Sequence, residues 1–243
     1  MTNILRNSSF EGEWYHKDGR PEFQIPNEWV FTDLGTGSPN PHDPNPWAKF
    51  VPPEVRVMLR HQLPLHEQDV FILRGDQCLK VFKGNGSWHG SLAQVLDLDS
   101  GSYELTIKLY ADLVKDYGPG GKVWGDDPQG RDGLVRLSGG DTKTNWLSLT
   151  PGTLNTLSLK FDASGETTVA VEIMCPFPLA NSGVFCDDWR LEALSMIPCR
   201  GDPRVQFKRT YVLLPSDADV EWAVAAASGA HEARWAMGYD ADD

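Results

Sequence analysis

Residues 92–113 read LAQVLDLDSGSYELTIKLYADL, and their pattern predicts how the chain folds. Every second residue from Tyr103 to Leu109 is apolar, and the residues between them are polar, charged or amphipathic. A period of two is typical of a β-strand with one buried face. Residues 97–102, DLDSGS, are rich in turn formers, so we expect a β-hairpin whose arms flank them. Because a hairpin cannot bury its apolar face alone, other strands must cover it.

Strand signals recur on both sides of this stretch. Short apolar or alternating segments stand at residues 70–73, 78–82, 133–137, 145–149, 154–161, 167–173 and 184–191. The segments 154–161 and 167–173 flank a turn at 162–166, which predicts a second hairpin. About eight to ten short strands separated by turn residues indicate an all-β fold, an antiparallel β-sandwich.

A proline-rich segment lies in the loop-rich first part of the chain. Residues 39–47, PNPHDPNPW, carry four prolines and therefore form neither a helix nor a central strand. Aromatic residues are frequent around it, whereas disordered segments have few. We expect an ordered surface loop that is anchored by Trp47.

Composition excludes several classes of partner. The 243 residues are 40% hydrophobic, enough for a substantial core, and carry a net charge of −12. This charge argues against binding of nucleic acid and of anionic membrane surfaces. No apolar run reaches the roughly 18 residues of a membrane span, so we expect no membrane insertion. The first residues lack a signal-peptide pattern, so the protein either does not use that route or is a mature or trimmed chain.

The four cysteines are Cys78, Cys175, Cys186 and Cys199. None forms a CxxC pair, which argues against a zinc site. One or two disulfides are compatible with this number, and whether Cys175 and Cys186 pair stays open.

From about residue 200 the pattern changes. Residues 209–214 predict a strand, and residues 219–227 predict an alanine-rich helix with Ser216 as its N-cap. We therefore divide the chain into a sandwich at 1–197 and a C-terminal α/β extension or linker at 198–243. A strand without a partner can pair with another chain, so self-association through this tail is a further expectation.

Three motifs stand in order along the sandwich. They read NILRNSSFE at residues 3–11, QVL at 94–96 followed by GSYEL at 101–105, and FCDDWRL at 185–191. In this order they resemble the carbohydrate-binding-module-like jelly rolls, which are galactose-binding-like β-sandwiches. The resemblance covers roughly residues 1–195. It implies a jelly-roll fold, a polysaccharide or glycan as partner, and a location outside the cell or on a cell or virion surface.

The resemblance also implies a structural calcium ion. In such modules the Glu after the Phe of the first motif and an Asp of the last motif bind Ca²⁺ where the first and last strands adjoin. Here these residues are Glu11 with Asp187 or Asp188. Calcium prefers several oxygen ligands, and two carboxylates neutralise it. Alternatively, Glu11 is a solvated charge and the Asp pair caps a strand end. The acidic residues 126–132 lack the spacing of a calcium loop, and we expect a solvated loop there.

Aromatic side chains outside the apolar strand patterns are candidates for sugar binding. The rings of Trp and Tyr can stack on the C–H faces of pyranoses. The candidate rings are Trp88, Trp124 and Tyr110, with Gln94, Lys108, Arg136 and Asp126 as candidate hydrogen-bonding partners for hydroxyl groups. Alternatively, each Trp closes a loop against the sandwich. Trp146 and Trp189 lie in apolar strand patterns, so we expect them in the core.

No catalytic motif accompanies these residues. The six histidines are scattered, and the sequence contains no HExxH, GxSxG or phosphate-binding loop. The sequence predicts a non-catalytic carbohydrate-binding β-sandwich with one structural calcium. The alternative is a structural or assembly module of a surface layer, filament or virion, with the C-terminal tail as its docking element.

Overall fold

A computed structural model describes residues 2–43, 45–196, 209–215 and 220–226 of the chain. The chain divides into two compact units, Met1–Met196 and Ile197–Asp243.

The first unit consists mainly of strands. They are β1 Trp14–His16, β2 Gln24–Pro26, β3 Val30–Asp33, β4 Glu54–Leu59, β5 Gln77–Lys83, β6 Trp88–Gly118, β7 Gly121–Trp124, β8 Leu134–Gly139, β9 Thr142–Lys143, β10 Leu147–Ser148, β11 Leu154–Cys175, β12 Asn181–Cys186 and β13 Arg190–Met196. The helical elements described are α1 Leu65–Phe71 and the short 3₁₀ turns η1 Lys17–Gly19 and η2 Arg60–Gln62. All pairings between these strands are antiparallel, which confirms the predicted all-β class.

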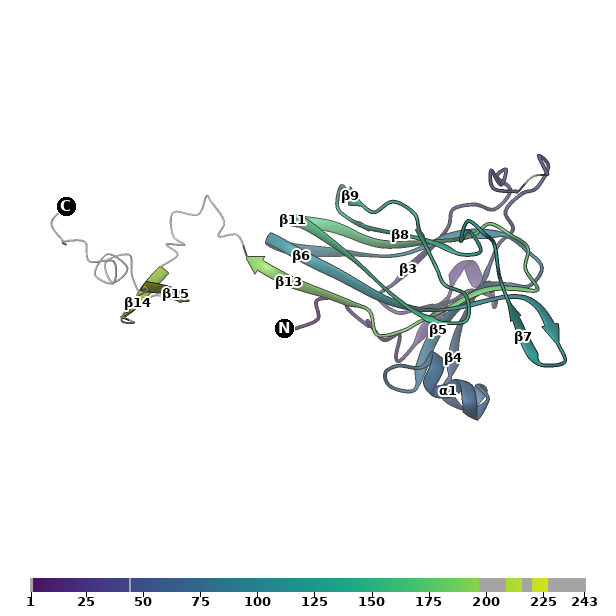
Figure 1. Ribbon diagram of the computed structural model, residues 1–243, viewed down its shortest axis with the longest axis horizontal. Helices are drawn as coiled ribbons and strands as arrows, with labels where there is room; N and C mark the ends of the chain where they lie inside the picture. The colour runs from purple at the N-terminus through teal and green to yellow at the C-terminus, as the bar shows by residue number, and fades with distance from the viewer. Residues whose placement is uncertain (1, 44, 197–208, 216–219, 227–243) are drawn as a thin grey trace. The chain divides into compact units, whose positions relative to one another are not determined.

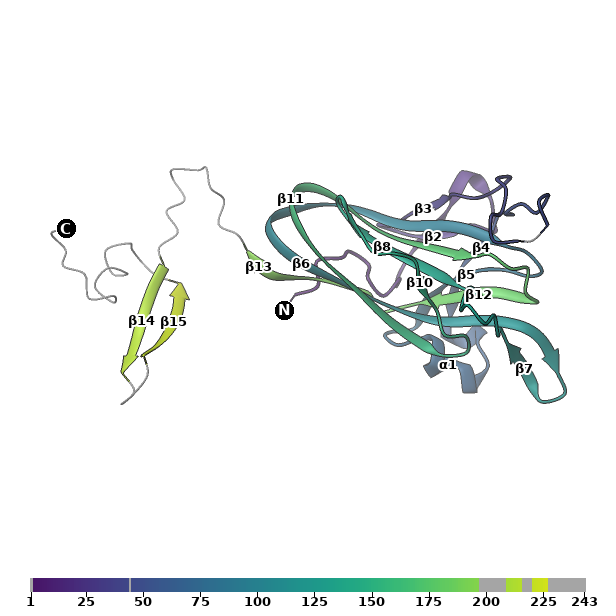
Figure 2. The same cartoon turned by 45° about the horizontal axis from the view of Figure 1, so that its top comes forward.

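The two predicted hairpins are wrong. β6 runs without interruption through residues 97–102, and β11 runs through 162–166. The two strands pair with each other along their whole common length, with one bulge between Ala163 and Gly165. Figure 2 shows this two-stranded ribbon turning back on itself at one end of the sandwich. Residues 97–102, which are rich in turn formers, lie at this bend. Their backbone groups do not pair with one another across a tight turn, because they pair with β11 instead.

The bend of the ribbon creates the two layers of the sandwich (Figure 1). In one layer the first half of β6 and the second half of β11 lie between β3 and β8. In the other layer the second half of β6 pairs with β12 and β13, and β5 and β4 follow beyond β12. The β-sandwich predicted from the strand spacing is confirmed, although the long strands differ from the many short ones expected.

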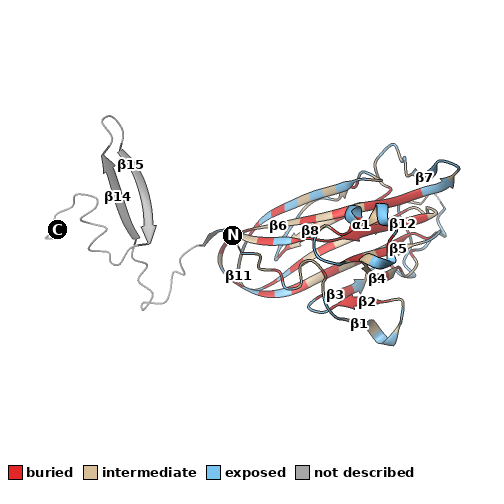
Figure 3. Ribbon diagram, turned by 90° about the horizontal axis from the view of Figure 1, so that it is seen from below, coloured by how far each residue is buried: buried red, intermediate tan, exposed pale blue. Residues whose placement is uncertain are grey.

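The hydrophobic core fills the space between the layers. Buried positions alternate along β6, as Figure 3 shows in red, and include every apolar position from Tyr103 to Leu109. Phe10, Trp29 and Trp189 form an aromatic group with ring centroids 5.1–5.4 Å apart. The backbone N–H of Trp189 donates to the Ser8 carbonyl at 3.0 Å. The first and last of the three sequence motifs therefore lie against each other.

Residues 65–71 form α1, where the apolar run 70–73 predicted a strand. A short apolar run does not distinguish a strand from a buried helical turn. The helix follows Pro64, and its last residue, Phe71, is buried against the outer face of the sheet together with Leu63 and Phe185. This face of the second layer is therefore covered by a helix.

The proline-rich loop is ordered by a residue other than the one predicted. Trp47 is 85% exposed, so it anchors nothing. Instead the buried Asn40 side chain donates to the Pro176 carbonyl at 2.6 Å and accepts a hydrogen bond from the His42 N–H at 3.1 Å.

Cys78, Cys175 and Cys186 are buried free thiols, so Cys175 and Cys186 do not pair. Burial raises the pKa of all three thiols far above the ordinary value. Cys199 lies outside the described residues.

In the second unit, β14 Arg209–Pro215 pairs antiparallel with β15 Val220–Ala226. The strand predicted at 209–214 is confirmed, and the helix predicted at 219–227 is wrong. Val220, Trp222 and Val224 alternate with other residues, which suits a strand. A segment of about seven residues is too short for a stable isolated helix, whereas pairing with β14 satisfies its backbone. The strand that was expected to be unpaired thus has a partner within the chain. Ser216 and the remaining tail residues lie outside the described residues.

Candidate functional site

The seven residues predicted to bind sugar do not form a single site. Two lie in the interior, three are held in ion pairs, and two meet in a surface pocket. The pocket contains the remaining side chains of the candidate site.

Trp88 is a core residue and offers no surface to a sugar. Its side chain is completely buried, and Nε1 donates to the Ser182 carbonyl at 2.7 Å. The glycine-rich sequence before it suggested a loop, but β6 begins at Trp88 and directs the ring between the layers. The predicted role of Trp88 as a platform is wrong.

Gln94 is also buried, and both ends of its amide are used. Oε1 accepts from the Arg6 N–H at 3.2 Å, and Nε2 donates to the Arg6 carbonyl at 2.5 Å. Gln94 therefore fixes the N-terminal segment to β6, and the prediction that it meets ligand is wrong.

Lys108 and Arg136 are each paired with a carboxylate. Lys108 Nζ lies 2.5 Å from Asp188 Oδ2, and Arg190 lies 3.4 Å from the same carboxylate. Burial alone would raise the pKa of Asp188, but the hydrogen bond from Lys108 holds it below the ordinary value. Arg136 Nε donates to Glu172 Oε2 at 2.8 Å.

Arg136 lies over the Trp146 ring, with 4.7 Å between the guanidinium carbon and the ring centroid. Trp146 is partly buried and packs on a small separate cluster of Phe50, Leu134 and Met174. Arg136 belongs to β8 in the first layer, whereas Lys108 belongs to the half of β6 in the second layer. The two residues therefore do not share a site.

Tyr110 and Trp124 come together beside α1 and β7. We call the cavity there the aromatic pocket; its volume is about 360 Å³. It is lined by His66, Glu67, Val70, Phe71, Tyr110, Gly121, Lys122 and Trp124. Figure 1 shows α1 and β7 at the same region of the sandwich.

The rings of the aromatic pocket hold one another at fixed angles. The centroids of Phe71 and Tyr110 lie 4.9 Å apart with the rings inclined by 67°, and those of Tyr110 and Trp124 lie 6.4 Å apart at 68°. Such edge-to-face pairs are favourable. The Tyr110 hydroxyl donates to the Gly152 carbonyl at 2.9 Å. A Cβ on Gly152 would lie 2.5 Å from the Trp124 ring, so only glycine allows this contact.

Lys122 connects the two walls of the pocket. Its Nζ donates to Glu67 Oε1 on α1 and to Asp112 Oδ1 on β6, both at 2.9 Å. Burial would lower the pKa of Lys122, but these two hydrogen bonds raise it, so the ammonium stays charged. Asp112 also accepts from the Asn181 amide at 2.9 Å and lies 3.7 Å from Lys80.

The sequence did not reveal Glu67, Phe71 and Lys122 as members of the site. Lys122 and Trp124 are two residues apart on β7, so their shared face was a usable signal. Glu67 and Phe71 carried no such signal, because the segment around them suggested a strand rather than a helix.

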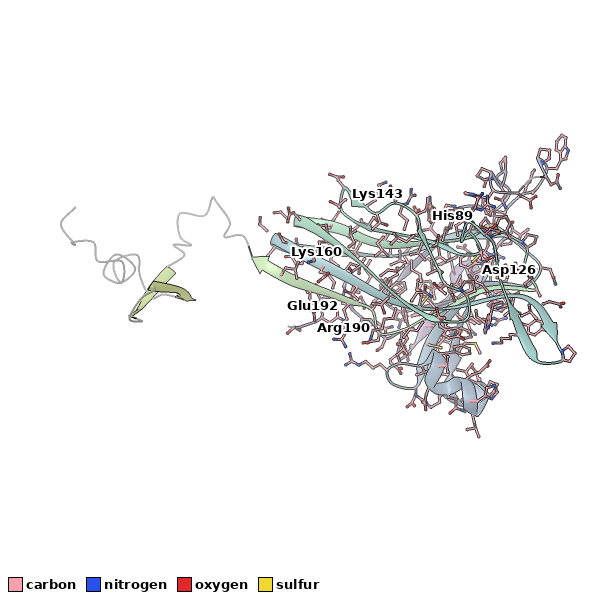
Figure 4. The ribbon with its side chains drawn as sticks, in the orientation of Figure 1. His89, Asp126, Lys143, Lys160, Arg190 and Glu192 are labelled. Atoms are coloured by element: carbon pink, nitrogen blue, oxygen red, sulfur yellow. The ribbon has the colours of Figure 1, made fainter. Side chains whose placement is uncertain are left out.

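The acidic loop 126–132 is more ordered than expected. Asp127 accepts from the Arg131 guanidinium at 2.9 Å, and this interaction lowers the pKa of Asp127 to about 2. Asp132 is buried and accepts from the Asp127 N–H at 2.8 Å. Asp126, labelled in Figure 4, accepts two hydrogen bonds from Lys115, so its predicted role toward a sugar hydroxyl has no support in its contacts.

The carboxylates proposed for calcium hold one segment of backbone. Glu11 Oε1 accepts from the N–H groups of Asp76 and Gln77, both at 2.9 Å. Asp187 Oδ2 accepts from the N–H groups of Leu73 and Arg74 at 2.6 and 2.9 Å. Burial raises the pKa of Asp187 to about 6, although these hydrogen bonds oppose the shift. Within the described ranges, no three His, Cys, Asp or Glu side chains gather as a metal-binding group.

The side-chain amide of Gln77 lies next to Glu11. One terminal atom of this amide faces the carbonyl oxygens of Phe10 and Gly12. With the amide nitrogen at that position, it donates to both carbonyls at 3.2 Å. Carboxylate and carbonyl oxygens are the ligands that a hard cation such as Ca²⁺ prefers. Asp188 does not fit this role, because Lys108 and Arg190 already neutralise it.

Comparison with known proteins gives likenesses of fold. No family model matches the chain, and no curated protein matches it. Among solved structures, the chain is similar to TmCBM61 in complex with β-1,4-galactotriose, with 17% identity and a TM-score of 0.45 over 79% of this chain and 99% of the other.

Two further structures are similar to a comparable degree. A cyclase from Fischerella sp. TAU in complex with 4-(1H-indol-3-yl)butan-2-one is 19% identical, with a TM-score of 0.46 over 81% of this chain and 100% of the other. The CBM22-1 xylan-binding domain of Paenibacillus barcinonensis Xyn10C is 9% identical, with a TM-score of 0.41 over 78% and 94%. Several neighbours are thus carbohydrate-binding modules, but these TM-scores lie below 0.5, and a ligand named there belongs to that protein.

Proposed function

We propose that this chain is a non-catalytic carbohydrate-binding module whose sugar site is the aromatic pocket. The observation that carries the proposal is the meeting of Tyr110 and Trp124 with Lys122 and Glu67 in one surface cavity. Of the seven residues that the sequence suggested, these two rings lie together in one cavity.

The chemistry of the pocket suits a sugar ring. Pyranoses present apolar C–H faces to aromatic side chains and hydroxyl groups to polar neighbours. Here Trp124 and Tyr110 supply the rings, and Lys122 and Glu67 supply a donor and an acceptor beside them. Because the rings are held by Phe71 and Gly152, little side-chain entropy is lost on binding.

The carboxylates of the pocket are not placed as an acid–base pair. Glu67 and Asp112 both accept hydrogen bonds from the same Lys122 ammonium, so the two carboxyl groups share one cation. A glycosidase needs one carboxyl group that stays protonated to donate a proton. We therefore propose binding without hydrolysis, by a protein located outside the cell or on a cell or virion surface.

Binding to a panel of soluble neutral polysaccharides, followed by calorimetry and affinity electrophoresis, tests the proposal. We expect Trp124→Ala to weaken binding about tenfold or more. The control is Trp47→Ala, which removes an exposed Trp that does not line the pocket and should leave affinity unchanged. Equal affinity of Trp124→Ala and wild type, with the melting temperature retained, or no binding to any glycan, would overturn it.

We propose further that a structural calcium ion binds at Glu11. The supporting observations are the Glu11 carboxylate and the backbone carbonyls of the residues before and after it in the chain, Phe10 and Gly12. Asp187 would act beside this site by holding the 73–74 backbone, which belongs to the same connection as residues 75–77. The ion would tie the N-terminal motif to the start of β5.

Thermal unfolding in calcium and in EDTA tests this site. A ligand at about 100 times its Kd stabilises by roughly 2.7 kcal/mol, which for a domain of this size raises Tm by about 5–10 °C. We expect this rise in the wild type and in the control Glu13→Gln, which neutralises an exposed neighbour, but not in Glu11→Gln. A wild type that melts at the same temperature in both buffers contradicts the proposal.

A further inference from the structure

The ionic groups at the aromatic pocket cancel one another. Lys122 lies between Glu67 and Asp112, and Lys80 lies beneath them, 3.7 Å from Asp112. Two ammonium groups thus face two carboxylates, and the formal charge of this quartet is zero. All four side chains are mostly buried, with exposed fractions from 4% for Asp112 to 26% for Lys122.

Among the residues that the structure describes, two accept a hydrogen bond from the Lys122 ammonium. An ammonium group carries three protons, and Lys122 directs one to Glu67 and one to Asp112. A neutral sugar hydroxyl can accept from the third proton and donate to Glu67 at the same time. A sugar carboxylate or sulfate at that proton would be the third anion around one ammonium and would be repelled by the other two. The anionic group of the sugar would also lose its hydrating water without gaining a cation that is not already paired.

We propose that the aromatic pocket selects neutral glycans and rejects those that carry carboxylate or sulfate groups, because Glu67 and Asp112 already neutralise Lys122. This inference rests on the proposed function and names the class of sugar that the site accepts. The net charge of −12 acts in the same direction over longer distances.

Glu67 is the residue through which this selection can be reversed. Glu67→Gln keeps the shape of the side chain and leaves the quartet with a charge of +1. Asp112→Asn is less suitable, because Asp112 is buried and also holds Asn181. The matched control is Glu192→Gln on β13, which changes the net charge of the protein by the same amount and does not line the pocket (Figure 4).

The probes are a matched pair: a neutral polysaccharide that binds the wild type, and the same polymer with part of its primary hydroxymethyl groups oxidised to carboxylates. Calorimetry is carried out at pH 8, above the ordinary pKa of an imidazole, and in moderate salt to screen the net charge. We expect the wild type and Glu192→Gln to bind the oxidised polymer at least tenfold more weakly than the neutral one. In Glu67→Gln the ratio of the two affinities should shift at least tenfold toward the oxidised polymer.

The outcomes separate the two proposals. Equal affinity of the wild type for both polymers, or an unchanged ratio in Glu67→Gln with the fold intact, overturns the selection for neutral glycans while carbohydrate binding stands. Failure of the wild type to bind any neutral polymer overturns the proposed function and, with it, the selection.

Discussion

At the scale of single residues, Gly152 determines where Trp124 lies. Its φ of +71° is unfavourable for other residues, and the Trp124 ring occupies the space that a Cβ would take. The Gly152 carbonyl also accepts the hydrogen bond from Tyr110, so this one residue positions both candidate sugar-binding rings.

Gly152→Ala should therefore weaken both stability and binding. Backbone strain of about 1–2 kcal/mol and overlap with the ring of about 1–3 kcal/mol predict a loss of roughly 2–5 kcal/mol in the free energy of unfolding. Urea denaturation measures it. Gly120→Ala is the control, because a Cβ there meets no atom within 4 Å, and it should change stability by less than about 0.5 kcal/mol. Equal effects of the two substitutions would contradict the assigned role of Gly152.

Asp187 makes stability depend on pH. Its pKa is raised to about 6 in the folded protein from an ordinary value of 3.8, so the folded state binds the proton more tightly than the unfolded state. The stabilising contribution of the protonated form is complete below pH 4 and is lost as the pH rises through 6. Two pKa units correspond to about 3 kcal/mol as an upper estimate.

The pH dependence is read from the difference between the wild type and Asp187→Asn, which has no charge to bury. In calcium-free buffer, the free energy of unfolding of the wild type should fall relative to the variant between pH 4 and pH 7. Denaturation curves at four or five pH values measure this difference. Parallel pH profiles of the two proteins would show that Asp187 does not titrate in this range.

At the scale of elements, α1 forms one wall of the aromatic pocket, and Phe71 is its buried contact with the sheet. Phe71 stacks on Phe185 of β12 with centroids 3.8 Å apart and an angle of 4°, and its edge meets Tyr110. The helix has seven residues, too few to be stable without such packing. The wall therefore depends on contacts with the sheet rather than on helix propensity.

Phe71→Ala should remove the wall. Truncation of a buried Phe costs about 3–5 kcal/mol. We expect the free energy of unfolding, measured by denaturant titration, to fall by that amount. Glycan affinity should fall in the same variant under native conditions. Val70→Ala changes the exposed preceding residue of α1 and should cost less than about 1 kcal/mol. A loss in Phe71→Ala no larger than that in Val70→Ala would contradict the packing role.

At the scale of the whole molecule, the first unit has its own core. One large hydrophobic cluster and two smaller ones lie within residues 2–196, and the N-terminal motif is bonded to the last strand of the same unit. The candidate sugar and calcium sites both lie in this unit.

A chain that ends after Met196 should therefore fold and bind as the full chain does. We expect its melting temperature to agree with that of the first transition of the full protein, and its affinity for the neutral glycan to agree within a factor of two. Calorimetry measures both. Loss of cooperative unfolding in the shortened chain would show that the first unit needs the second.

Within the described residues, no helix is long and apolar enough to cross a membrane. The pairing of β14 with β15 also removes the observation that suggested docking of the tail on another chain.

The sequence by itself determined which residues of the long strands face the core. The alternation from Tyr103 to Leu109 is a local property of the chain, because successive side chains of a strand point to opposite faces, and all its apolar positions are buried. The resemblance carried by the three motifs likewise implied that the first and last segments meet. Which face of a strand is buried depends on the polarity of its own residues, so the sequence is enough to predict it.

Only the tertiary structure decided what pairs with what. Residues 97–102 have the composition of a turn, but pairing with β11 makes them a bend in a continuous strand. Trp88 and Trp124 both follow or lie among glycines, yet one fills the core and the other lines a pocket. The sequence suggested that Lys108 and Arg136 are available for a ligand, but in the structure they pair with Asp188 and Glu172. These outcomes depend on contacts between residues that are distant in the chain. The local sequence around a residue does not specify which distant residue it contacts.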